Sequence, residues 1–209
     1  MHRPRPAVVI PGAPLLVPEL VGSPGDPDAD RVRAAVLQAG RWLGARAHTW
    51  RVVAAGPLTG SDGAPPLASG RAGTFVGFGA DVLVTAAPGG PSGDKGPDPH
   101  WPLPLLVASW LRGSSAPSAL LTEDDDADGL VFVLDGPATL TARAPGGHRP
   151  EDEAVFAAQV AAVCDGGPAD GLDDAWRAAA AAFAGGTAEI LYRGAPFGVG
   201  YLVAVGGSA

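Results

Sequence analysis

The order of apolar segments along the chain constrains its fold most, because short strand-like runs alternate with longer stretches of helical spacing. Short continuous apolar runs favour buried strands, whereas apolar residues three or four apart favour helices. The pattern predicts strands at 7–10, 50–55, 119–122 and 130–134, an edge pair at 75–78 and 82–85, and helices from Asp28 or Asp30 to 45, at 103–111, at 151–163 and at 173–183. This alternation predicts an α/β sandwich with a mostly parallel central sheet flanked by helices and some antiparallel pairing at its edge.

The last predicted element is a pair of strands near the C-terminus. Two apolar runs flank the connector Gly194-Ala195-Pro196. Gly198 and Gly200 permit a close backbone approach that a side chain would block. We therefore expect a hairpin that closes the sheet and carries Phe197 and Tyr201 near its turn.

Length and composition indicate a single folded unit. A chain of 209 residues is long enough for one sizeable domain. Its content of 46% hydrophobic and 17% charged residues favours a well-buried core over disorder. We expect one α/β domain over residues 1–209.

Charge and cysteine content exclude several classes of partner. The net charge of −8 disfavours nucleic acid and anionic membrane surfaces, since both require basic patches. The first apolar run, Ala7–Ile10, is too short for a secretory signal or a membrane span. Cys164 is the single cysteine, so no internal disulfide can form. We expect a cytoplasmic protein that binds neither nucleic acid nor membrane.

The predicted site lies beyond the carboxyl ends of the strands, where open α/β sheets bind their ligands. The segments that follow Ile10, Ala55 and Leu134 are therefore the places to look for chemistry. The candidate residues of this cleft are Pro11, Gly12, Ala13, Pro14, Glu19, Gly56, Pro57, Asp135, Phe197 and Tyr201. Glu19 has three open interpretations: a helix N-terminal cap, a surface salt bridge or a ligand contact.

Three segments carry a resemblance to a known family: 10–19, 73–81 and the C-terminal block 190–204. Together they resemble the actinobacterial branch of the class III extradiol ring-cleavage dioxygenase family. The resemblance covers most of the chain and implies that family's fold. Active members hold Fe(II) with two histidines and one carboxylate, and they leave positions open for a catecholate and O₂.

This chain lacks the histidines that the resemblance implies. The segment Pro11-Gly12-Ala13-Pro14-Leu15-Leu16 stands where relatives have Pro-His-Pro-Pro-Leu-Leu. No histidine follows the second strand in Val53-Ala54-Ala55-Gly56-Pro57, where relatives have Ser-Pro-His. Ala138 stands in the place of a third histidine, which acts as acid and base in active relatives. We therefore expect no metal, and a catalytically degenerate protein that keeps a cleft for a small apolar or aromatic ligand or for a partner.

Two alternatives remain open. An active Fe(II) dioxygenase would need a rebuilt metal site, for which His100, His148 and Asp135 are the candidate ligands. A non-catalytic subunit or scaffold, paired with a partner protein or with a second copy, would need interface anchors. The candidate anchors are Phe75, Phe78, Trp101 and Trp110.

Overall fold

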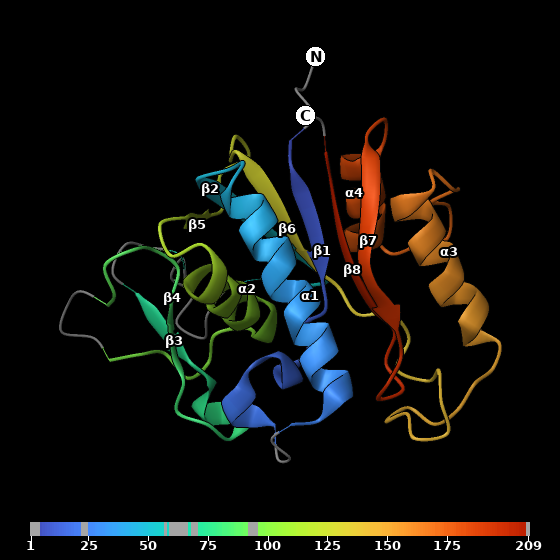
Figure 1. Cartoon of the computed structure of the whole chain (residues 1–209), viewed down its shortest axis with the longest axis horizontal. Coiled ribbons are helices and arrows are strands. Elements are labelled where there is room, and N and C mark those ends of the chain that lie inside the picture. The colour runs from blue at the N-terminus through green and yellow to red at the C-terminus, as the bar shows by residue number, and fades with distance from the viewer. Residues whose placement is uncertain are drawn as a thin grey trace.

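The computed structural model describes residues 5–21, 25–56, 58, 67, 71–91 and 96–207. A six-stranded sheet in the order β5-β2-β6-β1-β8-β7 forms its centre (Figure 1). Its strands are β1 (Ala7–Ile10), β2 (Thr49–Ala54), β5 (Leu120–Thr122), β6 (Gly129–Val133), β7 (Thr187–Gly194) and β8 (Tyr201–Gly207).

The sheet is mostly parallel and becomes antiparallel on one side. Strands β5, β2, β6 and β1 run parallel, while β8 pairs antiparallel with β1 and β7 pairs antiparallel with β8. Every residue of β1 and β6 is buried, as expected for strands covered on both faces. The predicted sheet and the predicted closing hairpin are both confirmed.

Helices cover both faces of the sheet. Helices α1 (Pro27–Gly44) and α2 (Leu103–Ser115) lie on one face, and α3 (Asp152–Cys164) and α4 (Asp174–Phe183) belong to the other. Figure 1 shows α1 and α2 in front of the strands and α4 behind them. Alternate residues of β1 supply the two cores, with Val8 and Ile10 facing α1 and α2.

Helix α1 begins earlier than the sequence predicted. Its N-cap is Asp26, whose carboxylate accepts hydrogen bonds from the backbone N–H groups of Asp28 and Ala29. Pro27 then occupies the first helical position, where its missing N–H costs nothing. The prediction of a cap at Asp28 or Asp30 is wrong, because both residues lie inside the first turn.

The predicted edge pair at 75–78 and 82–85 is also wrong in its first half. Residues Phe75–Phe78 form the short 3-10 helix η3, and β4 (Leu83–Thr85) pairs with β3 (Ala72–Thr74) in a separate two-stranded sheet. The Thr74 hydroxyl accepts a hydrogen bond from the N–H of Val76 and starts the helical turn. Gly79, at φ 104°, ends it in a conformation that favours glycine.

The chain leaves the two central strands toward opposite faces. After β1 it passes through two 3-10 turns, η1 (Pro14–Leu16) and η2 (Pro18–Leu20), to α1 on one face. After β6 it passes to α3 on the other face. Since β1 and β6 are parallel neighbours, a crevice is expected between their carboxyl ends, where α/β sheets bind ligands.

In the described part of the chain, no helix combines the length and apolar character needed to cross a membrane.

Candidate ligand site at the carboxyl ends of β1 and β6

A hydrogen bond joins the two loops that leave β1 and β6. The backbone N–H of Gly12 donates to Oδ1 of Asp135 at 3.1 Å. Ile10 pairs with Val133 in the last register position, so each of the bonded residues lies two positions beyond its strand. The N–H of Leu134 also donates to the Ile10 carbonyl at 2.9 Å, which extends the pairing. Two predicted site residues therefore meet at the edge where ligands are expected.

Asp135 has an unusual electrostatic environment for a carboxylate. Its side chain is exposed on the outer side, yet enough protein surrounds the carboxylate that burial raises its pKa to about 6. The hydrogen bond from Gly12 acts in the opposite direction and lowers that pKa. Among the described residues, no other hydrogen bond and no ion pair reaches Asp135. This side chain therefore keeps unused acceptor capacity toward the outside.

Tyr201, the first residue of β8, belongs to the same site. It is 3% exposed. Burial raises the pKa of its phenol, and the negative charge of Asp135 and the phenol of Tyr192 raise it further. Tyr201 is thus a neutral phenol near the carboxylate.

Gly12 leaves room for the Asp135 carboxylate. A Cβ atom at this position would lie 3.1 Å from Asp135 Oδ2 and 3.3 Å from Val133 Cγ1, closer than ordinary contact. A side chain here would therefore press on the carboxylate or displace it. The place that the resemblance gives to a metal-binding histidine lies directly beside Asp135.

Two further glycines fix the distance between Asp135 and Tyr201, and sequence reasoning recognised the role of only one. The N–H of Gly136 donates to the Gly200 carbonyl at 2.8 Å, and the N–H of Gly200 donates to the Pro137 carbonyl at 3.0 Å. A Cβ atom on either glycine would lie within 2.8 Å of the Phe156 ring of α3. The expected close approach at Gly200 is confirmed. The partner residue Phe156 is far away in sequence, so no local signal identified it.

The remaining predicted residues lie around this edge with different exposures. Pro11 and Ala13 are buried next to Gly12, and Pro14 begins η1. Phe197 is half-buried in the turn between β7 and β8 and packs against the core shared with α1 and α2. Glu19 is exposed in η2.

The segment after β2 is described only in part. Gly56 is exposed and has φ +92°, with nothing within 4 Å of a Cβ placed on it. Pro57 lies outside the described residues.

The structure does not bring the alternative metal ligands together. Between residues 5 and 207, no described group of three His, Cys, Asp or Glu side chains is arranged to hold a metal ion. His100 and His148 are both exposed on loops. The backbone N–H of His100 donates to the carboxylate of Asp98 at 2.8 Å, so this loop forms a local turn.

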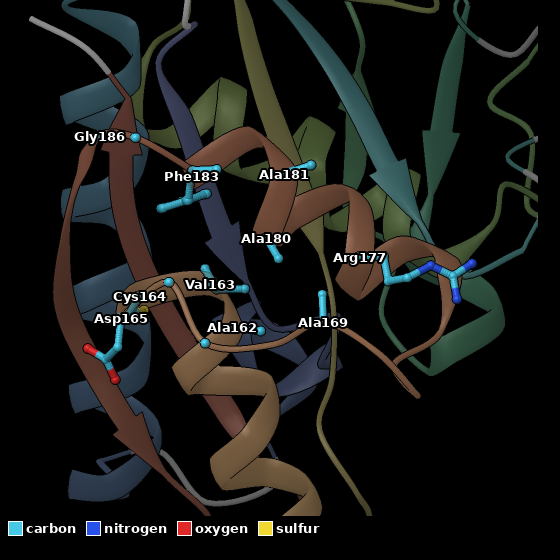
Figure 2. A pocket seen from close by; sticks show the side chains of 14 residues that line it. Ala162, Val163, Cys164, Asp165, Ala169, Arg177, Ala180, Ala181, Phe183 and Gly186 are labelled. Carbon is cyan, nitrogen blue, oxygen red and sulfur yellow. The ribbon is translucent and has the colours of Figure 1, made fainter.

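A pocket of about 610 Å³ lies between the carboxyl ends of α3 and α4 (Figure 2). The chain continues from it into β7, which runs parallel to β1, so the pocket lies toward the amino edge of the sheet, away from Asp135. Its floor is mostly alanine, and Figure 2 shows Asp165 and Arg177 at opposite ends, extending away from that floor. Burial raises the pKa of the Cys164 thiol to about 11, which makes it a poor nucleophile at neutral pH.

Comparison of the chain with family models, with curated proteins and with solved structures finds no match.

Proposed function

We propose that this protein is a catalytically degenerate relative of the class III extradiol ring-cleavage dioxygenases. In this proposal it binds a small apolar or aromatic ligand beside Asp135 and does so without Fe(II). The observation that carries the proposal is the hydrogen bond between the Gly12 N–H and Asp135 Oδ1. It places a glycine, which has no ligating side chain, where the resemblance implies a metal-binding imidazole, next to a carboxylate that keeps free acceptor capacity.

The donor set favours an organic ligand over iron. Neither Gly12 nor Ala138 has a side-chain lone pair to give to a metal. Loss of partners that merely orient metal ligands already costs about 10–100-fold in metal affinity, and loss of the ligands themselves costs more. A single carboxylate with one backbone hydrogen bond is a typical orienting group in a small-molecule site.

The surroundings of Asp135 favour a ligand with apolar surface. Tyr201 and Phe197 contribute aromatic rings to the core that reaches this edge, and Val133 lies close to the Gly12 position. Small-molecule sites commonly combine such apolar walls with a few placed polar groups. The divergence of the chain after β1 and β6 supplies the expected crevice.

Metal analysis tests the metal-free part of the proposal. The protein is expressed with added iron and purified, and its metal content is measured for the wild type, His100→Ala and His148→Ala. We expect iron far below one atom per chain in all three. Stoichiometric iron that is lost in either alanine variant would contradict the proposal and support an active dioxygenase with a rebuilt site.

Ligand binding tests the other part. Benzyl alcohol serves as a neutral aromatic probe, titrated by calorimetry against the wild type and against Tyr201→Trp, which overfills the site. We expect millimolar or tighter binding to the wild type and a clear loss in the variant. Absence of any binding of the probe would count against the proposed function.

One observation favours a non-catalytic subunit as a second candidate. Three large apolar side chains are exposed on the unit formed by β3, η3 and β4: Val76 at 51%, Phe78 at 42% and Leu83 at 47%. Of the predicted anchors, Phe75, Trp101 and Trp110 are buried in the core, so that part of the expectation is wrong. Light scattering at several concentrations, on wild type and Phe78→Ser, tests this role. A persistent monomer that captures no partner in a pull-down would oppose it.

A further inference from the structure

We propose that the ligand held beside Asp135 is an organic cation, an ammonium group carried on an apolar or aromatic body, and that Asp135 accepts its N–H. This inference rests on the proposed function and narrows it to one class of ligand. It depends on three features: the unfilled acceptor capacity of Asp135, the aromatic residues beside it, and the absence of a protein cation that neutralises it within the described residues.

The first feature is the partial satisfaction of the carboxylate. Asp135 Oδ1 accepts the Gly12 N–H at 3.1 Å, and within the described residues this is the only hydrogen bond that the side chain makes. A carboxylate has about four lone-pair positions for acceptance. The side chain is exposed on its outer side, so a ligand can reach the remaining positions. The site therefore requires a hydrogen-bond donor.

The second feature is aromatic. Tyr201 lies near enough to both Asp135 and Tyr192 for each to affect its phenol. Tyr192 and Phe197 pack against the same core as Tyr201, on the side of the sheet that α1 covers. Aromatic rings attract an ammonium group through their negative faces, and this attraction increases when water is excluded. These rings therefore suit the body of the ligand as well as its charge.

The third feature distinguishes a cation from other ligands. No Lys, Arg or His side chain pairs with Asp135 among the described residues, so an anionic ligand would meet an uncompensated negative charge. A neutral donor would satisfy only the hydrogen bond. An ammonium group supplies both the donor and the opposite charge, and charge-assisted hydrogen bonds are about twice as strong as neutral ones.

Three probes of the same size test the inference: benzylammonium, benzyl alcohol and benzoate, each titrated at neutral pH by calorimetry. We expect benzylammonium to bind about tenfold or more tightly than benzyl alcohol, and benzoate to bind least. Asp135→Asn keeps the acceptor for Gly12 but removes the charge. It should reduce the affinity for benzylammonium to that for benzyl alcohol, and leave the affinity for benzyl alcohol nearly unchanged.

Asp165→Asn is the matched control. It removes a carboxylate from the pocket between α3 and α4, and we expect no change in benzylammonium binding. A thermal unfolding curve of each variant verifies that it is folded. Equal affinity for benzylammonium and benzyl alcohol would overturn the cation inference but leave the proposed function standing. Failure of both probes to bind would overturn the proposed function itself.

Discussion

At the scale of single residues, Asp135 is held where its charge is costly. Burial raises its pKa to about 6, and the structure offers it only one hydrogen bond within the described residues, from Gly12. Residues that keep a disfavoured charge at the edge of a sheet are candidates for function, since stability alone would replace them. The position therefore predicts a conflict between stability and binding that can be measured.

We predict that Asp135→Asn stabilises the protein at pH 7. A carboxyl group whose pKa is raised from 3.8 to about 6 favours the folded state only while it is protonated. Its contribution is therefore present below about pH 4 and is lost as the pH rises through 6. Because the outer side of the carboxylate is exposed, we expect a gain in the free energy of unfolding on the order of 1 kcal/mol at pH 7, measured by urea denaturation.

The same measurement at pH 4 provides the internal control, because the wild-type carboxyl is then mostly protonated and the two proteins should be nearly equally stable. Glu19→Gln removes an exposed carboxylate from η2 and should change the free energy of unfolding by less than about 0.5 kcal/mol. A wild type more stable than Asp135→Asn at pH 7 would show that the charge is compensated by a group not identified above.

At the scale of elements, the start of α1 depends on one side chain. The Asp26 carboxylate accepts from two backbone N–H groups, Asp28 at 2.9 Å and Ala29 at 3.1 Å. These groups have no partner inside the helix. Asp28 lies in the first turn instead and pairs with Arg31 on the exposed surface. The two aspartates therefore make different contributions although they are two residues apart.

We predict that Asp26→Ala lowers the free energy of unfolding by about 1 kcal/mol, the usual cost of a lost N-cap. Asp28→Ala should cost only a few tenths of a kcal/mol, because an exposed ion pair and a helix-dipole contact are each weak. Urea denaturation of both variants, with Asp26→Ser as a conservative replacement that keeps a cap, measures the difference. Equal losses in the two alanine variants would mean that Asp26 is not the cap.

Comparison of these elements with the sequence shows which signals are local. The apolar run Ala7–Ile10 became β1 with the predicted bounds, because a buried strand requires only a continuous apolar run. The run Phe75–Phe78 has the same apolar character but folds as η3. Its outcome depends on the Thr74 hydroxyl and on the left-handed Gly79, and short apolar runs do not distinguish these two cases.

The candidate site was predictable in membership but not in contacts. Gly12, Asp135 and Tyr201 follow or begin strands, so the rule of carboxyl ends and the family resemblance both selected their neighbourhood. The hydrogen bond between Gly12 and Asp135 depends on β6 lying next to β1, although 123 residues separate them in the chain. Strand order across a sheet is a nonlocal property, and no spacing in the sequence encodes it.

At the scale of the whole molecule, one sheet serves two cores. Strand β1 sends Val8 and Ile10 toward α1 and α2, and Ala7 and Val9 toward α3 and α4. A loss of packing on either face therefore weakens the strand on which the other face depends. This arrangement supports the expectation of a single domain, since neither helical layer has a sheet of its own.

We predict that truncations on opposite faces lower one common unfolding transition. Leu105→Ala removes a fully buried side chain from α2, and Phe183→Ala removes a buried ring from α4 on the other face. Each should cost about 2–5 kcal/mol. Far-ultraviolet circular dichroism and tryptophan fluorescence should report the same midpoint in each variant, because Trp50 lies in one core and Trp176 in the other. Two separate transitions would show that the layers unfold independently and that the single-domain expectation is wrong.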